Sequence, residues 1–176
     1  DVVTNKRLER PVAECDVRAV DGKPILRWKD LGAEHYVTYR ATEKSGPYSR
    51  MLTTEKLSYI NTSAVAGKTY YYKIRAVYAN GSGLLSGIYE NTATCGQPEI
   101  EKGNNSSGLP TLKWDPAEGA AKYEVYRSED GKDYVKALTT TGTSYTNTSA
   151  EEGITYYYKV RGITSNGLTG AYSDVV

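Results

Sequence analysis

Short runs of alternating apolar and polar residues follow one another along this chain, and turn residues separate them. The clearest run is Thr69–Tyr78, in which every second residue is apolar or aromatic and the charged residues fall between them. A period of two is typical of a β-strand with one buried face. No segment shows a convincing helical period. The pattern therefore predicts an all-β chain.

In the first half, the same pattern predicts strands near residues 12–20, 25–29, 36–42, 48–52, 58–61, 69–78 and 86–94. Turn signals separate strands of this kind along the chain, at Asp21-Gly22, Ser45-Gly46-Pro47, Asn80-Gly81, Asp130-Gly131 and Asn166-Gly167. About seven short strands in ~80–90 residues are the signature of a β-sandwich.

The second half of the chain repeats the first. Leu26-Arg27-Trp28 recurs as Leu112-Lys113-Trp114, and GKTYYYKIRA at 67–76 recurs as GITYYYKVRG at 153–162. An internal repeat of this length indicates an array of similar units. We therefore expect two tandem domains, residues 11–95 and 96–176. Residues 1–10 are interpreted as the end of a preceding repeat or a linker, because Asp1-Val2-Val3 has the letters of Asp174-Val175-Val176.

Strand alternation predicts which side chains of the tyrosine-rich run face the core. Tyr70 and Tyr72 share a face with Ile74, whereas the other face carries the charges, so the tyrosine face is predicted to be buried. A tyrosine that enters this strand can hydrogen-bond back to the preceding connection and form a tyrosine corner. We assign the two structural tyrosine corners to Tyr70 and Tyr156.

These motifs resemble those of fibronectin type III domains. The resemblance rests on the Trp of the second strand, the Tyr and Arg of the third, and the GxTYYYK[IV]R[AG] run, and it covers nearly all of both units. It is nearest to the domains of large surface and secreted proteins of Gram-positive bacteria. The resemblance implies two tandem seven-stranded fibronectin type III-like (immunoglobulin-like) β-sandwiches. An immunoglobulin domain proper would carry a Cys pair on strands that have no Cys here.

Composition narrows the classes of partner. Hydrophobic residues make up 39% and charged residues 24%, and the formal net charge is +1. This balance does not point to nucleic acid or an anionic membrane surface. No apolar run approaches the ~20 residues of a membrane-spanning helix, so membrane insertion is not expected.

The two cysteines leave two alternatives open. Cys15 and Cys95 have no second Cys or His at metal-ligand spacing. They form either a disulfide that closes the first module or two free thiols. A disulfide would favour an oxidising compartment.

The sequence offers no convincing catalytic group. His35 is the one histidine, and its counterpart in the repeat is Lys122, which indicates a solvent-facing position rather than a catalytic triad. No phosphate-binding loop, zinc spacing or calcium loop occurs. We expect no catalytic residue, no metal and no cofactor, and therefore no enzyme activity in the chain.

The outward faces of the third and sixth strands are the candidate ligand surfaces. Their predicted residues are Tyr39, Tyr71, Arg75, Tyr126, Tyr157 and Arg161. Exposed Tyr rings can stack on sugars, and Arg can hydrogen-bond hydroxyl groups. The competing interpretation is cross-strand pairing that stabilises the sheet, with aromatic–cation contacts of ~0.5–1 kcal/mol each.

The function expected from these features is that of an extracellular or cell wall-attached spacer from a larger bacterial protein. One alternative is an adhesion module that binds a carbohydrate or a protein, and another is a decoration or tail domain of a phage virion. The expected partners are neighbouring domains of the same chain, or a glycan or host surface protein.

The tyrosine corners give the first prediction. Tyr70→Phe or Tyr156→Phe should lower the free energy of unfolding of its own unit by ~1–2 kcal/mol through a lost hydrogen bond. Thermal melting of each variant beside the parent chain measures this. Unchanged melting of both variants would show that the corners lie elsewhere.

Overall fold

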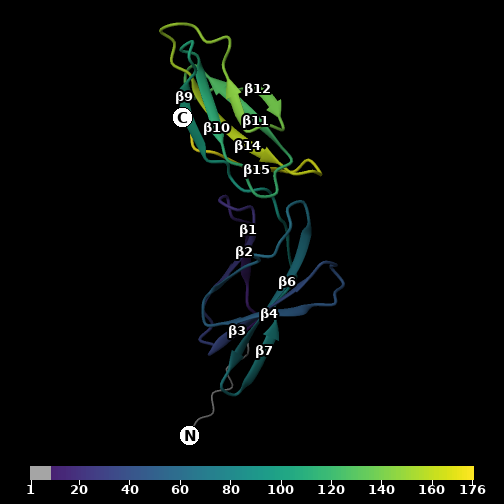
Figure 1. Cartoon of the computed structure of the whole chain (residues 1–176). Coiled ribbons are helices and arrows are strands. Elements are labelled where there is room, and N and C mark those ends of the chain that lie inside the picture. The colour runs from purple at the N-terminus through teal and green to yellow at the C-terminus, as the bar shows by residue number, and fades with distance from the viewer. Residues whose placement is uncertain (1–8) are drawn as a thin grey trace. The chain divides into compact units, whose positions relative to one another are not determined.

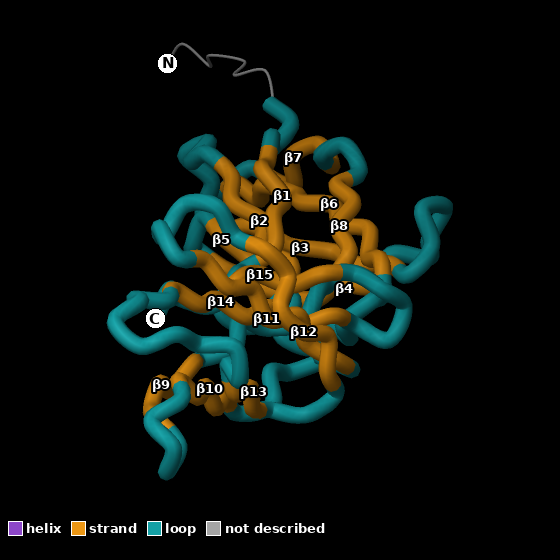
Figure 2. The backbone as a smooth tube through the Cα atoms, turned by 90° about the horizontal axis from the view of Figure 1, so that it is seen from above, coloured by secondary structure: helices purple, strands orange, loops and turns teal. Residues whose placement is uncertain are grey.

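The computed structural model of the chain describes residues 9–176, and in this range it contains strands and loops without a helix (Figures 1 and 2). Consequently, residues 9–176 hold no helix long and apolar enough to cross a membrane. The expected end of a preceding repeat, residues 1–10, lies outside the described residues apart from its last two positions. The predicted all-β class is confirmed.

The chain divides into two compact units. Unit 1 comprises Asp1–Val17, Pro24–Ala64 and Thr69–Thr92, of which residues 1–8 are not described. Unit 2 comprises Arg18–Lys23, Val65–Lys68 and Ala93–Val176. Each unit holds two antiparallel sheets of its own.

Unit 1 contains eight strands, one more than the seven predicted, because an additional strand lies before the one expected at 86–94. They are β1 (Ala13–Val17), β2 (Pro24–Trp28), β3 (His35–Ala41), β4 (Ser49–Thr54), β5 (Ser58–Ile60), β6 (Thr69–Tyr78), β7 (Gly81–Leu85) and β8 (Tyr89–Thr92). The smaller sheet has the order β1-β2-β5, and the larger has the order β4-β3-β6-β7 with β8 also paired to β6.

The core of unit 1 follows from the alternation along β6. Tyr72, Ile74 and Ala76 are fully buried, and the intervening residues are half-buried on the opposite face. From the facing sheet, Leu26 and Trp28 of β2 are also buried. The ring of Trp28 packs on Tyr36 of β3 with centroids 5.5 Å apart. This contact joins the two sheets across the core.

The last strand of unit 1 is broken, which the sequence pattern did not predict. A single strand was expected at 86–94, but the structure has β7 before Ser86 and β8 after it. The hydroxyl of Ser86 accepts a hydrogen bond from Ile74 N (2.9 Å) and donates one to Gly87 O (2.7 Å). The side chain thereby takes the place of a backbone acceptor, which lets the chain leave the regular ladder at this point.

Unit 2 contains seven strands. They are β9 (Ile100–Asn104), β10 (Pro110–Trp114), β11 (Lys122–Ser128), β12 (Val135–Thr140), β13 (Ser144–Thr146), β14 (Tyr157–Ile163) and β15 (Thr169–Tyr172). The sheets have the orders β13-β10-β9 and β12-β11-β14-β15. The buried residues at the centre repeat those of unit 1 in kind; they are Leu112, Trp114, Tyr123, Val125, Tyr158 and Val160.

A buried tyrosine–asparagine hydrogen bond recurs in both units. Asn61 Nδ2 donates to the hydroxyl of Tyr72 (2.8 Å), and Asn147 Nδ2 donates to that of Tyr158 (2.9 Å). Both asparagines are buried, and Arg40 or Arg127 donates to their side-chain oxygens. Because buried polar groups need partners, each bond fixes the loop after β5 or β13 to the central strand.

The predicted tyrosine corners, Tyr70 and Tyr156, lie two residues before these buried tyrosines. The hydroxyl of Tyr156 accepts a hydrogen bond from Glu151 N (3.1 Å), in the connection that precedes β14, and its ring is half-buried. Tyr70 is 5% exposed. The guanidinium of Arg40 lies over the Tyr70 ring and that of Arg127 over the Tyr156 ring, each at 5.3 Å from the centroid.

The run of three tyrosines in unit 2 gives a matched test of the core. Tyr158→Phe should lower the free energy of unfolding of unit 2 by ~1–3 kcal/mol, because Asn147 Nδ2 loses its buried acceptor. For a unit of this size, this is a fall in Tm of roughly 4–8 °C per kcal/mol. Tyr157→Phe, on the exposed side of the same strand, is the control and should melt like the parent. Equal melting of the two variants would contradict the role of the buried bond.

Candidate functional site

The candidate residues lie on the outer faces of the two larger sheets, opposite the cores. The unit 1 outer face is defined here by Val37, Tyr39, Tyr71, Lys73, Arg75 and Leu85. The unit 2 outer face is defined by Glu124, Tyr126, Tyr157, Lys159, Arg161 and Tyr172. Strand register places Tyr39 opposite Lys73 and Tyr126 opposite Lys159, as the repeat implies.

Glu124 is the centre of the unit 2 outer face. It lies directly opposite Arg161, which donates from Nε (2.9 Å) and Nη2 (2.7 Å) to its Oε2. The Tyr126 hydroxyl donates to the same oxygen (3.0 Å), and Lys136 Nζ donates to Oε1 (3.1 Å). The carboxylate therefore accepts hydrogen bonds from three side chains on three different strands, the arrangement that makes a charged pair strong.

Aromatic rings and cations surround this carboxylate. Tyr126 and Tyr172 meet edge to face with centroids 5.4 Å apart, and Arg161 lies 4.9 Å from the Tyr172 centroid. Lys159 Nζ lies 4.0 Å from the centroid of Tyr134 and 4.5 Å from that of Tyr172. Contacts of this kind are worth ~0.5–1 kcal/mol each at exposed sites.

Burial and hydrogen bonding shift the titration of these groups in opposite directions. Burial works to raise the pKa of Glu124, but the hydrogen bonds from Arg161, Lys136 and Tyr126 outweigh it, so the pKa lies below its ordinary value of 4.5. The pKa of Tyr126 is raised to about 12, first by burial and then by its hydrogen bonds with Tyr172 and Glu124. At neutral pH the cluster therefore holds a carboxylate and a neutral phenol.

Only some of the predicted unit 2 residues come together. Tyr126 and Arg161 are in direct contact, since Arg161 Nη2 donates to the Tyr126 hydroxyl (3.0 Å). Tyr157 lies opposite Ser128 instead and is 36% exposed. The rings of Tyr126 and Tyr172 are engaged by each other and by cations, so this arrangement fits cross-strand stabilisation better than sugar stacking.

The unit 1 outer face has the same plan with different residues. Lys73 Nζ lies 4.1 Å from the centroid of Tyr48, as Lys159 does over Tyr134 in unit 2. Val37 lies opposite Arg75, in the place of Glu124, and Leu85 takes the place of Tyr172. Tyr39 and Tyr71 are half-buried on this face.

Arg75 differs sharply from its counterpart Arg161. Its Nε is buried and has no hydrogen-bond partner among the residues that the structure describes. Arg161 is tied to Glu124 and Tyr126, whereas the residue opposite Arg75 is a valine. The two predicted arginines therefore have different environments.

The sequence analysis missed Glu124, Lys136 and Tyr172. Alternation along β11 places Glu124 on the same face as Tyr126, and the repeat alignment shows a valine at the equivalent position. These two signals were present in the sequence. Its contact with Arg161, however, depends on the β11–β14 register, which alternation alone does not give.

Both cysteines are free thiols in the structure, which is the second of the two alternatives. Cys15 is half-buried in β1, and Cys95 is fully buried in unit 2. Cys95 Sγ packs where a Cβ on Gly162 or Gly170 would lie, at 2.9 and 2.8 Å, so these positions need glycine. Burial raises the pKa of both thiols, which disfavours the reactive thiolate.

His35 begins β3 at a half-buried position opposite Val77, and its counterpart Lys122 is exposed at the start of β11. Among residues 9–176, no group of three or more His, Cys, Asp or Glu side chains is arranged to hold a metal ion.

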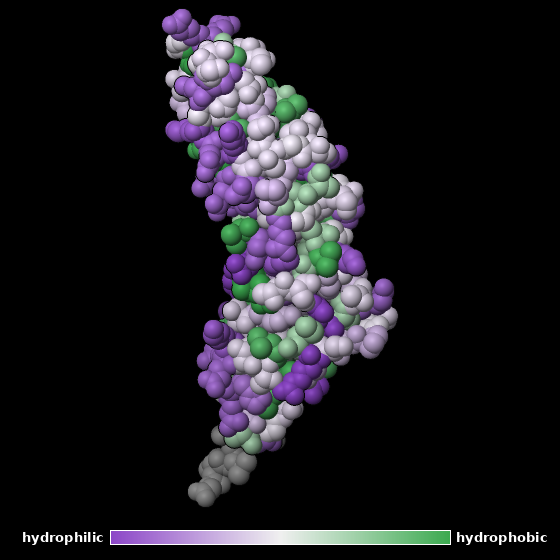
Figure 3. Space-filling view, viewed as in Figure 1, coloured by the Kyte–Doolittle hydropathy of each residue, from purple (hydrophilic) through white to green (hydrophobic). Residues whose placement is uncertain are grey.

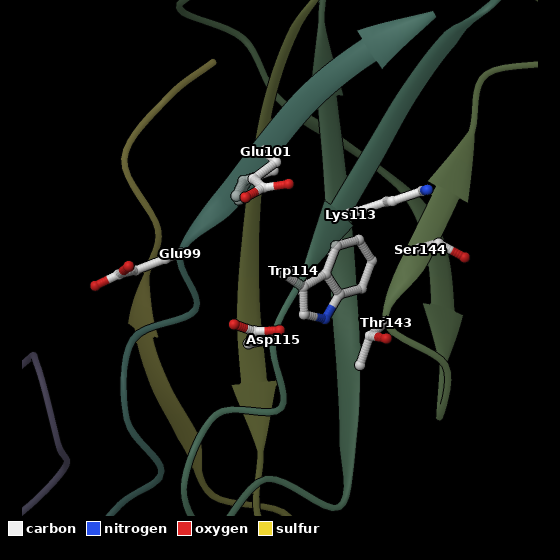
Figure 4. A pocket seen from close by; sticks show the side chains of 8 residues that line it. Glu99, Glu101, Lys113, Trp114, Asp115, Thr143 and Ser144 are labelled. Atoms are coloured by element: carbon white, nitrogen blue, oxygen red, sulfur yellow. The ribbon is translucent and has the colours of Figure 1, made fainter. Parts of the chain in front are cut away.

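One hollow of unit 2, of about 540 Å³, is lined by acidic and hydroxyl side chains (Figure 4). Glu99, Glu101 and Asp115 border it, together with Thr143, Ser144 and the basic side chain of Lys113. The indole of Trp114 forms its inner wall, and its buried Nε1 has no partner in the described part of the chain. Trp28 Nε1 in unit 1 is likewise buried without a partner among the described residues. A buried indole N–H without a partner is therefore common to both units and does not single out this hollow.

A second hollow of unit 2, of about 510 Å³, lies beside the start of β14. In unit 1, the corresponding stretch of β6 pairs with β8. In unit 2, Val176 exchanges two backbone hydrogen bonds with Tyr158, at 2.9 and 3.1 Å. The hollow thus borders the position of a paired strand, so we assign it to strand packing rather than to a small ligand.

The face in Figure 3 shows hydrophobic residues scattered among hydrophilic ones. Isolated apolar residues of this kind are usual on a protein surface. The hydropathy of this face therefore singles out no binding area.

Comparison with known proteins finds similarity to short parts of two larger enzymes. No family model matches it. It is 29% identical over 183 aligned positions to an amylopullulanase of Thermoanaerobacter thermohydrosulfuricus, covering 96% of this chain and 12% of that protein. It is 43% identical over 62 residues to a poly(3-hydroxybutyrate) depolymerase of Delftia acidovorans, covering 35% of this chain and 12% of that protein. The matched segments thus cover only about an eighth of the length of each of these relatives.

Among solved structures, the chain is similar to a segment of two fibronectin type III domains from chicken tenascin. The two share 17% identity with a TM-score of 0.54, over 94% of this chain and 95% of that segment. At this identity the likeness establishes the fold. The fibronectin type III-like β-sandwich expected from the sequence is therefore confirmed.

Glu124 gives a pH-dependent prediction. Glu124→Gln should lower the free energy of unfolding of unit 2 by ~1–3 kcal/mol at pH 7, because charge-assisted hydrogen bonds are lost. The folded pKa of Glu124 lies below its unfolded value near 4.5, so its stabilisation is fully present above that pH. It is lost as the pH falls through the folded pKa.

Melting of the parent and the Glu124→Gln variant between pH 7 and pH 2 measures this effect. The difference in Tm should be largest at pH 7 and should shrink below pH ~4. Glu152→Gln, at an exposed turn position that takes part in none of the ion pairs found in residues 9–176, is the control. A difference in Tm that persisted unchanged to pH 2 would mean that the Glu124 charge contributes nothing.

Proposed function

We propose that the chain is a pair of non-catalytic fibronectin type III-like modules that space other domains within a larger extracellular bacterial protein. The similarity to short parts of two enzymes with different named substrates supports this best. A segment shared by such different enzymes is expected to serve something other than the chemistry of either one.

The construction of the units supports a spacer. Each unit has its own buried centre, with Leu26 and Tyr72 in unit 1 and Leu112 and Tyr158 in unit 2. Repeat proteins built in this way add length by adding units. On the unit 2 outer face, the polar and aromatic groups are engaged with one another, which fits a structural surface.

The proposed location is outside the cell or attached to the cell wall. This part of the proposal rests on the GxTYYYK[IV]R[AG] run, which resembles domains of surface and secreted proteins of Gram-positive bacteria. The neighbouring domains of the same polypeptide are the first partners proposed. A binding role is the second candidate. The observation that favours it is Arg75 Nε on the unit 1 outer face, which has no hydrogen-bond partner within residues 9–176.

Assays on the 176-residue chain test the absence of a catalytic or polymer-binding role. We expect no product from pullulan, starch or poly(3-hydroxybutyrate), and no more retention on insoluble starch or polyester granules than an unrelated protein of similar size shows. Retention that soluble oligosaccharides reverse would make the chain a carbohydrate-binding module. Polymer hydrolysis would overturn the proposal altogether.

A further inference from the structure

We propose that the unit 1 outer face binds a carboxylate, supplied by an acidic side chain on the surface of another protein, at Arg75. This inference goes beyond the spacer function and does not depend on it. It starts from the difference between the two repeats at one pair of positions, Val37 in unit 1 and Glu124 in unit 2.

Unit 2 shows what a filled site of this kind looks like. Its carboxylate receives hydrogen bonds from Arg161, Tyr126 and Lys136, at 2.7 to 3.1 Å. Glu124 itself is only 9% exposed. A largely buried carboxylate is stable there because donors from three strands surround it.

Unit 1 keeps counterparts of these donors but not the acceptor. Arg75 corresponds to Arg161, since Val37 and Glu124 lie directly opposite them in register. Tyr39 and Arg50 form a register pair, as Tyr126 and Lys136 do. At the position of Glu124, unit 1 has the apolar side chain of Val37.

The missing acceptor leaves Arg75 in an unfavourable state. Its Nε is shut off from solvent and has no hydrogen-bond partner in residues 9–176. None of the ion pairs found in that range includes Arg75. A buried donor without a partner is costly, and a donor on a guanidinium more so. Arg75 as a whole is only half-buried, so a change of its side-chain rotamer would bring Nε to an external carboxylate, and that contact would relieve the cost.

The charges around Arg75 favour an acidic occupant. Lys73 and Arg50 add two further positive charges on this face, one on each side of Tyr39 in register. Glu90, an acidic side chain on the same sheet, lies opposite Tyr71. That position is four residues from Arg75 along β6, or about 13 Å. Two charged residues border the end near Arg75: Glu34 N donates to Val77 O (2.9 Å), and Arg10 Nη1 donates to Leu85 O (3.4 Å). These two charges cancel, so the balance at this end stays positive.

The apolar neighbours favour a protein surface as the source of the carboxylate. Leu85 lies opposite Arg75 where unit 2 has Tyr172, and Val37 replaces the glutamate. Val37 is 5% exposed and Leu85 is half-buried, so a small carboxylate would leave the exposed parts of these side chains, chiefly that of Leu85, wet. An acidic side chain with apolar neighbours would cover them and exclude water, which strengthens the charge pair.

The test is NMR spectroscopy of the ¹⁵N-labelled 176-residue chain, with sodium acetate as the probe against sodium chloride at constant ionic strength. The arginine Nε–Hε resonances report on each guanidinium. Acetate should shift the Arg75 signal saturably, with an affinity about tenfold or more above any effect at Arg161, whose carboxylate is already in place. Equal responses of the two arginines, or no saturable shift at Arg75, would overturn the proposal.

Reciprocal variants control for general effects of the probe. Val37→Glu should fill the site from within and abolish the acetate response of Arg75, while moving its Hε signal toward that of Arg161. Glu124→Val should make Arg161 responsive. Dispersed backbone spectra verify that each variant is folded. A Val37→Glu chain that still binds acetate at Arg75 would contradict the proposal.

Three further probes distinguish the sources of the carboxylate. The blocked peptide acetyl-Leu-Glu-Leu-amide should bind at Arg75 more tightly than acetate, and its glutamine counterpart should not bind. D-glucuronate should bind no more tightly than acetate. Tighter binding of glucuronate than of the glutamate peptide would overturn the protein source in favour of an acidic sugar. These results are independent of whether the chain binds or cleaves neutral polymers.

Discussion

Alternation along the central strand of the larger sheet is the constraint from which the rest of each unit follows. Because successive side chains point to opposite faces, the run YYYKIR in β6 places Tyr72 and Ile74 in the core and Lys73 and Arg75 on the outer face. A shift by one residue would bury the charges. The Asn61–Tyr72 hydrogen bond holds this register against the loop after β5.

Much of the fold could be predicted from periodicity and repeat alone, but contacts between strands could not. The positions of β2, β3, β5 and β6 were close to those expected. The break after β7 was not, because it depends on the Ser86 hydroxyl replacing a backbone acceptor, and serine occurs in many other settings. Similarly, Tyr126 and Arg161 were predicted to share a face, but their common partner Glu124 emerges only from the register. Local pattern fixes the face of a residue, and long-range pairing fixes its neighbours.

The two units differ least in their cores and most on their outer faces. Equivalent core positions carry the same residue type in both units, as Leu26 and Leu112 or Trp28 and Trp114 do. On the outer face, glutamate is exchanged for valine and tyrosine for leucine without loss of the sheet. The reason is that β-strand pairing depends mainly on the backbone ladder and on burial of the inner face, so outer positions are freer to vary. Differences in function between the repeats are therefore expected on the outer faces.

The same cluster of donors has opposite consequences in the two units. In unit 2, Arg161 donates its hydrogen bonds to Glu124 of the same unit, so the interaction contributes to folding stability. In unit 1, Arg75 Nε is buried and has no partner in the described chain, so it can contribute to association once the side chain turns toward a partner. A carboxylate of the same unit and a carboxylate of a partner compete for the same arginine N–H groups. One module therefore cannot bind both carboxylates fully. On the proposal made above, the pair combines one unit closed on itself with one open to an acidic partner, which a spacer made of two identical units could not provide.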